Sequence, residues 1–303
     1  MQRILKYIIS ENTAPVTILD FLKKAGFSRH ILSSMKNTSN TIILNGERGF
    51  GRSVLKPQDH LVITVPETES GENIIRTKMD LDIIYEDEDI LVINKPADMP
   101  VHPSAGNYEN TLANGIAWYF AEKGEDFVYR CINRLDRDTT GALILAKNPL
   151  SAAILSVQMK KRQIRRTYLA LVDGLLPDAG TINAPIARME GSVITREVNF
   201  ETGESAITHY ERLAAGKEYS LAELHLETGR THQIRVHMKY INHPVTGDEK
   251  YGRKCAVMDT QGQCLHAYQL TLVHPSTHQK MTFTAPLPQY FETLLEKLRR
   301  EDI

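Results

Sequence analysis

Apolar patterns typical of strands and of helices follow one another along residues 82–226 without a regular alternation, and this order limits the possible folds more than any other feature. Strand patterns occupy residues 83–85, 90–94, 142–146, 168–172 and 221–226. Helical spacing occupies residues 112–121 and 149–161. A strict strand–helix–strand alternation would predict a doubly wound parallel sheet, whereas this mixed order favours an α+β fold.

The first 66 residues have a self-contained pattern of their own. A helical pattern ends at Gly26, a second helix is expected from Ser28, and the Asn45-Gly46 pair after an apolar run predicts a hairpin turn. The following residues, 67–80, are polar and show no periodicity. We therefore expect a small α/β domain over residues 1–66, a linker over 67–80 and a larger domain over 81–303.

Composition places the chain among globular proteins, and its charge is unevenly distributed. The 303 residues are 42% hydrophobic, and no apolar run reaches the ~18–20 residues of a membrane span, so a cytoplasmic protein without a membrane partner is expected. The net charge is −1 overall, but residues 1–66 hold nine Lys/Arg and four Asp/Glu, a net charge of +5. Such asymmetry is typical of a nucleic-acid-binding module, although a solvated basic face explains it as well.

The densest group of reactive side chains lies at residues 132–141, with the sequence INRLDRDTTG, directly before an apolar strand. Asp136 lies between Arg134 and Arg137 in the sequence, so its carboxylate should stay ionised. An ionised carboxylate in a cationic pocket can act as a nucleophile or as an electrostatic stabiliser. A salt-bridged turn without catalytic function remains the alternative.

The INRLDRDTTG segment resembles the Arg-Leu-Asp-x-x-Thr-Ser/Thr-Gly signature of the RluA-type pseudouridine synthases. Five further segments resemble that family in the same order, over roughly residues 83–288: residues 93–104, 166–170, 227–237, 243–252, and the closing pair 265–270 and 283–286. The resemblance implies a long mixed, mostly antiparallel sheet flanked by helices, with the active site in a basic cleft across it. It also implies an isomerase that converts uridine in RNA to pseudouridine without a cofactor.

The resemblance assigns functions to individual residues. Asp136 takes the place of the essential aspartate, and Arg134 that of the arginine that helps displace the target nucleotide. Tyr168 takes the place of the tyrosine that stacks on the target uracil, and Arg230 that of the arginine that pairs with the catalytic carboxylate. The chain departs from the family at Asn133, where histidine is common, and we expect an effect on loop packing or RNA contact.

Two further segments point to RNA as the partner. A basic run with no acidic residue precedes Tyr168 and could guide RNA phosphates, although a solvated helix end is the alternative; it contains Lys160, Lys161, Arg162, Arg165 and Arg166. Residues 15–66 resemble the alpha-L RNA-binding motif, from which residues 36–40 and Gln58 depart. We expect ribosomal rather than transfer RNA as the substrate, and a monomeric enzyme.

Histidine and cysteine positions do not predict a metal site. The three cysteines have no Cys-x-x-Cys spacing, so neither a disulfide framework nor a zinc site is expected. His232 and His237 would lie on opposite faces of a strand and far apart around a helix. Ile234, Met238 and Ile241 would share one face of a helix in this segment, and we expect Thr231 to cap it.

Two other functions fit the same residues. A non-catalytic RNA-binding or ribosome-assembly factor could keep the fold without the activity. A glycosidase could use Asp136 and Asp138 as its carboxylate pair, although two positions in one loop do not ensure the required separation.

Overall fold

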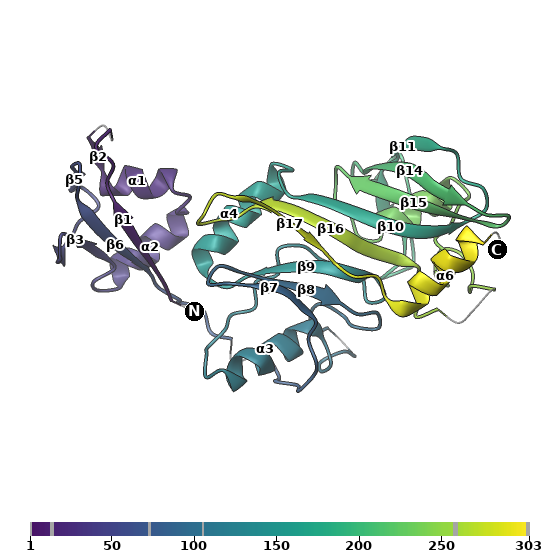
Figure 1. The fold of residues 1–303 in the computed structure, drawn as a ribbon, viewed down its shortest axis with the longest axis horizontal. Helices are drawn as coiled ribbons and strands as arrows, with labels where there is room; N and C mark the ends of the chain where they lie inside the picture. Colours follow the sequence, from purple (N-terminus) through teal and green to yellow (C-terminus); the bar gives the residue numbers. More distant parts are fainter. Residues whose placement is uncertain (1, 13–14, 72–73, 105, 257–259, 301–303) are drawn as a thin grey trace.

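The described residues among 2–65 form a small four-stranded sheet that packs with two helices (Figure 1). The computed structural model describes residues 2–12, 15–71, 74–104, 106–256 and 260–300. The strands of this sheet lie in the order β1 (Arg3–Ile8), β6 (His60–Val65), β3 (Ile42–Leu44), β4 (Glu47–Arg48). The remaining elements are β2 (Val16–Thr17), paired with β5 (Val54–Leu55), α1 (Ile18–Lys24) and α2 (Arg29–Asn37).

Local sequence signals explain these N-terminal elements. The Thr17 and Ser28 side chains accept hydrogen bonds from the backbone N–H groups of Asp20 and Ile31, so each residue caps the helix that follows it. Asn45 and Gly46 both have positive φ, 53° and 85°, as a tight two-residue hairpin turn requires. The predicted helix start at Ser28 and the predicted hairpin are therefore confirmed.

A nine-stranded sheet spans the rest of the chain (Figure 1). Its strands lie in the order β11 (Ala179–Asn183), β14 (Ile207–Ala215), β15 (Tyr219–Leu226), β10 (Arg165–Asp173), β16 (Leu265–Val273), β9 (Thr140–Ala146), β8 (Ile90–Lys95), β7 (Ile83–Glu86), and β17 (Lys280–Thr284) also pairs with β16. Within it, β9 and β16 are parallel and the other pairings are antiparallel. The predicted α+β fold with a long, mostly antiparallel sheet is confirmed.

Helices cover both faces of this sheet, because its central strands are apolar on both sides. On β8, Leu91 and Ile93 face one core and Ile90 and Val92 face another, and all four are buried. Helices α3 (Leu112–Glu122) and α5 (Gln233–Tyr240) contribute to the first core. Helices α4 (Pro149–Lys160) and α6 (Gln289–Arg299) pack on the opposite face.

Helix α4 also packs against the N-terminal sheet and its helices. Leu150 on α4 is buried in the same apolar cluster as the N-terminal core, and a Cβ on Gly26 would collide with Ile154. Arg3 on β1 forms two hydrogen bonds to the carboxylate of Asp89, of 3.1 and 3.0 Å, across this interface. The N-terminal part therefore shares a core with the rest of the chain.

The polar segment 67–80 forms no helix or strand in its described residues, 67–71 and 74–80. It is nevertheless attached to the larger part of the chain. Arg130 donates two hydrogen bonds to the carboxylate of Glu67, of 2.9 and 2.7 Å, and the Asn114 amide donates to the carbonyl of Ile75 at 2.7 Å.

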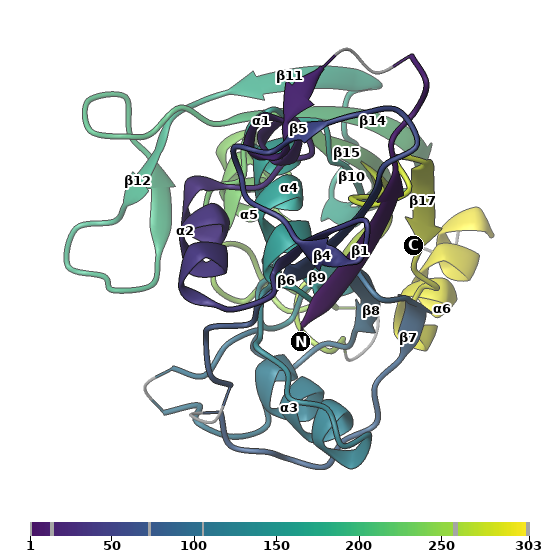
Figure 2. The same cartoon turned by 90° about the vertical axis from the view of Figure 1, so that its left-hand side faces the viewer.

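One predicted helix start is wrong. The N-cap of α5 is His232 and not Thr231, and His232 has a left-handed backbone, with φ 58° and ψ 20°. A short hairpin of β12 (Ile186–Arg188) and β13 (Arg196–Val198) projects from the body of the protein beside α5 (Figure 2). None of the helices in the described part of the chain is both long and apolar enough to span a bilayer.

Candidate active site

The loop that precedes β9 holds Asp136 in a fixed turn. The backbone N–H of Thr139 donates to the carbonyl of Asp136 at 3.2 Å, which closes the turn. Beneath it, the buried ammonium group of Lys95 donates to three carbonyls, those of Pro96, Met99 and Arg137, at 2.6, 2.9 and 2.7 Å. Three acceptors match the three N–H donors of an ammonium group, so Lys95 ties the Asp136 loop to the end of β8.

The residues after Asp136 fit the loop against β16. Thr140 shares a 2.7 Å hydrogen bond with the ring of the buried His266 on β16. Gly141 has φ +106°, and a Cβ there would collide with the backbone of Ala267. Glycine is required at this position because only glycine combines that backbone conformation with so close an approach. The Thr-Thr-Gly sequence thus fixes where the loop meets the sheet.

Arg235 on α5 is the charged partner of Asp136. Its Nη1 lies 3.0 Å from Asp136 Oδ2, while its Nε and Nη2 bind the carboxylate of Asp248 at 2.6 and 2.8 Å. The side chain is 7% exposed and that of Asp248 only 1%. Burial opposes the charge of Arg235, but the hydrogen bonds and charges of Asp248 and Asp136 outweigh it and raise the pKa of Arg235 above its usual value.

Asp136 lies in a cleft of about 1230 Å³ across the sheet. Tyr168 on β10 lines the same cleft and is 4% exposed. Burial raises the pKa of the Tyr168 hydroxyl, with the charge of Asp136 adding to the effect, so the phenol stays protonated at neutral pH. Arg134 and Arg230 also line the cleft, so the structure brings together the four residues that the resemblance singled out.

The cleft is strongly basic. Eight of its lining residues are Lys or Arg and two are acidic, Asp136 and Glu227. Four of the five residues of the predicted basic run line it, namely Lys160, Arg162, Arg165 and Arg166; Lys161 is exposed at the end of α4 and is not among the lining residues. Asp138, the second carboxylate of the alternative glycosidase reading, does not line the cleft either.

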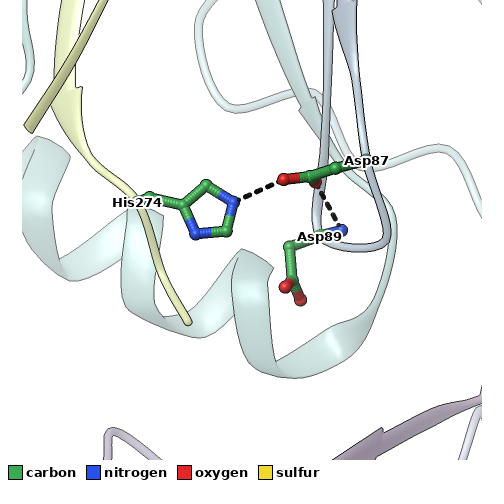
Figure 3. Close-up of side chains that lie close together, drawn as sticks. All are labelled: Asp87, Asp89 and His274. Atoms are coloured by element: carbon green, nitrogen blue, oxygen red, sulfur yellow. Dashed lines mark hydrogen bonds and ion pairs between the residues drawn. The ribbon is translucent and has the colours of Figure 1, made fainter. Parts of the chain in front are cut away.

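A separate group of two carboxylates and a histidine lies away from the cleft, where the β7–β8 turn meets the end of β16 (Figure 3). His274 Nε2 hydrogen-bonds to Asp87 at 2.8 Å, and both oxygens of Asp89 are hydrogen-bonded: Oδ1 to Arg3, Asn148 and Ser151, and Oδ2 to Arg3 and Ser276. These hydrogen bonds hold four segments of the chain together, which explains why the two carboxylates and the histidine lie close to one another.

Comparisons with known proteins agree with this geometry. Residues 89–240 match the family model described as RNA pseudouridylate synthase. The chain is 41% identical to the RNA pseudouridine synthase YlyB of Bacillus subtilis over 267 residues, which cover 86% of each protein. The chain belongs to the RNA pseudouridine synthase family.

Two other matches place this synthase more closely. It is 39% identical to the ribosomal large subunit pseudouridine synthase D of Pasteurella multocida, over 78% of this chain and 76% of that protein. A human structure titled RNA Pseudouridylate Synthase Domain Containing 4 superposes with a TM-score of 0.59 at 26% identity, covering 72% of this chain and 93% of that chain. The chain is therefore an RNA pseudouridine synthase of the RluA type, an isomerase.

The expected pairing of Arg230 with the catalytic carboxylate is wrong. Arg230 does not pair with Asp136: its guanidinium binds Glu204 and donates from Nε to the carbonyl of Ser205 at 3.1 Å. Arg230 precedes α5 and points toward the segment before β14, whereas Arg235 lies inside the helix and faces the Asp136 loop. Arg137 does not neutralise Asp136 either, since it binds Asp98 at 2.6 Å.

Asn133, the position at which the resemblance led us to expect histidine, is buried and fastens the loop to β9. Its side chain accepts a 2.9 Å hydrogen bond from the N–H of Ile144 and donates a 3.3 Å one to the carbonyl of Ala142. Asn133 therefore takes part in the packing of this loop. Arg235, Asp248 and Lys95 were not predicted from the sequence. A signal was present for Arg235, because it lies within the predicted helix, five residues after Arg230.

Proposed function

We propose that this enzyme isomerises specific uridines of ribosomal RNA to pseudouridine, with Asp136 as the catalytic carboxylate and no cofactor. The observation that carries the proposal is the Asp136–Arg235 ion pair, which lines the same basic cleft as Tyr168. Arg235 holds the carboxylate of Asp136 in a fixed orientation within the cleft.

The chemistry requires few groups. The N1–C1′ bond breaks, the uracil turns, and a C5–C1′ bond forms. The proton on C5 is removed and N1 takes up a proton, so the product is an isomer of the substrate. No group is added and no electron is gained or lost overall, so the reaction needs no redox partner. Asp136 supplies the negatively charged oxygen near the sugar, and Tyr168 supplies a planar surface for the detached base.

The basic rim supports RNA as the ligand. The target base must leave its stack to reach Asp136, which costs a few kcal/mol and least in loops or bulges. Arg134 is exposed and lies two residues before Asp136, and it would occupy the position in the stack that the target base leaves. Arg162, Arg165 and Arg166 would bind phosphates of the RNA.

We assign RNA binding to the N-terminal domain as well. Phe50 is 50% exposed, and the guanidinium groups of Arg48 and Arg52 lie 5.5 and 5.8 Å from its ring centroid. An exposed ring between two arginines suits an unpaired base and its phosphates. The N-terminal domain would then bind an RNA segment outside the cleft.

The substrate class rests on the relatives. Several relatives are named ribosomal large subunit pseudouridine synthase D, which favours large-subunit ribosomal RNA and a cytoplasmic location for this enzyme. The test is to map pseudouridines in total RNA from cells with and without the gene. Loss of one or more sites in large-subunit RNA supports the proposal. Loss confined to transfer RNA would refute the substrate, and an unchanged map would refute the activity.

A further inference from the structure

A chain of hydrogen bonds leads from the projecting hairpin toward Asp136 and ends at a histidine that the mechanism has not used. The backbone N–H of Arg196 on β13 donates to the hydroxyl oxygen of Tyr251 at 2.8 Å. That hydroxyl lies 2.7 Å from Nδ1 of His232. Among the described residues, Nδ1 is the acceptor that the structure offers to the hydroxyl hydrogen of Tyr251. The imidazole proton is then on Nε2.

Nε2 of His232 points at the catalytic carboxylate but does not reach it. It lies 3.9 Å from Asp136 Oδ2, which is too far for a direct hydrogen bond. An oxygen atom placed between them can lie at about 2.8 Å from both, the usual hydrogen-bond length. The His232 side chain lines the cleft and is 10% exposed, so such an oxygen would belong to whatever occupies the cleft.

The backbone supports a role beyond packing. His232 adopts a left-handed conformation, which costs a residue with a side chain of order 1 kcal/mol or more and is usually taken by glycine or asparagine. The side chain that results is held on one side by Tyr251 and left without a hydrogen-bond partner at Nε2 among the described residues. The arrangement aims an N–H donor into the cleft.

We propose that His232 binds the 2′-hydroxyl of the target uridine. In this arrangement Nε2–H donates to the hydroxyl oxygen, and the hydroxyl donates its hydrogen to Asp136 Oδ2. The other carboxylate oxygen, Oδ1, accepts no hydrogen bond from the described residues and is left to face the adjacent C1′. The inference rests on the proposed function, and it makes His232 the residue that distinguishes RNA from DNA at this site.

The site is tested with a synthetic RNA hairpin that carries the uridine mapped in the cells, and a second hairpin with 2′-deoxyuridine at that position only. Wild-type enzyme should convert the deoxy substrate about 10- to 150-fold more slowly, the effect of losing a hydrogen bond to a charged group. The His232→Leu variant should convert the ribo substrate more slowly than the wild type does. Deoxyuridine should cause a smaller additional loss in this variant than in the wild type, because the contact between His232 and the hydroxyl is already gone.

His232→Gln is the matched variant, because its amide N–H can replace Nε2–H, and it should recover much of the preference for the ribo substrate. It also keeps the test decisive if the leucine variant fails to fold. Equal wild-type rates on the two substrates, or losses that multiply in the His232→Leu variant, would overturn the inference. A wild-type enzyme that makes no pseudouridine in the ribo hairpin would instead refute the proposed function itself.

Discussion

Replacing Arg235 by lysine should slow catalysis far more than the same replacement at Arg230. Lysine keeps the positive charge but cannot bind Asp248 with two N–H groups and Asp136 with a third, as Arg235 does. A hydrogen bond to a charged group contributes about 1.5–3 kcal/mol, and about 1.4 kcal/mol corresponds to tenfold in rate. Losing the 3.0 Å contact to Asp136 therefore predicts about a 10- to 150-fold fall in turnover.

The Arg230→Lys variant is the control, because it removes the same geometry five residues away. The ion pair of Arg230 is with Glu204, whose side chain is 69% exposed, and exposed pairs contribute at most about 1 kcal/mol. We expect at most about a fivefold change in turnover. Its effect should appear mainly in RNA affinity, since Arg230 lines the cleft.

The assay is tritium release from [5-³H]uridine in a transcript of large-subunit ribosomal RNA, in single-turnover conditions with saturating enzyme. Arg235→Lys should also lower the free energy of unfolding by about 1–3 kcal/mol, because Asp248 is buried and loses part of its pairing. The rates must therefore be measured well below the unfolding transition. A wild-type rate in Arg235→Lys, or a larger loss in Arg230→Lys, would refute the reasoning.

Three further perturbations follow from particular contacts. Phe50→Ala should weaken RNA binding about 5- to 100-fold and leave turnover at saturation unchanged. Ile8→Ala, which removes a 66% exposed side chain from the same part of the chain, should leave RNA binding unchanged. Equal RNA affinities of Phe50→Ala and the wild type in filter binding would exclude the stacking role. Lys95→Met leaves three buried carbonyls without a donor and should cost about 2–4 kcal/mol in urea unfolding, and a loss under 1 kcal/mol would contradict its role as a tie. Burial lowers the pKa of His266 to about 4, below its value in the unfolded chain. The contribution of the neutral imidazole to the free energy of unfolding is therefore present above pH 6.5 and is lost as the pH falls toward 4. The free energy of unfolding should then fall by about 3 kcal/mol more in the wild type than in His266→Gln over that range, and parallel pH profiles would contradict it.

The sequence was sufficient for those elements whose structure is decided by local rules. Apolar runs predicted the strands β8 and β9. Ser28 predicted the start of α2, and Asn45-Gly46 predicted the hairpin turn. The family resemblance predicted that Asp136 and Tyr168 would share one cleft, although 32 positions separate them in the chain.

What could not be predicted depends on contacts between distant segments. Arg230 and Arg235 lie in one motif, and only the start of α5 at Gln233 decides that the second one faces Asp136. His232 begins that helix with a left-handed backbone, a conformation for which a histidine gives no local signal. The core shared by α4 and the N-terminal sheet likewise requires knowing how two parts of the chain pack.

That shared core also decides how the N-terminal domain should be tested. Deleting residues 1–66 would expose Leu150 and break the Arg3–Asp89 ion pair, so lost activity could reflect lost stability. A point substitution on the exposed surface, such as Phe50→Ala, avoids this difficulty.

The most direct test of the account is pseudouridine formation by purified Asp136→Asn enzyme. The amide keeps the size of the side chain but removes its charge, and Arg235 retains both hydrogen bonds to Asp248, so the protein should fold. We predict RNA affinity within a few-fold of the wild type and no detectable tritium release or pseudouridine. Isomerisation by this variant at a rate near that of the wild type would contradict the central claim.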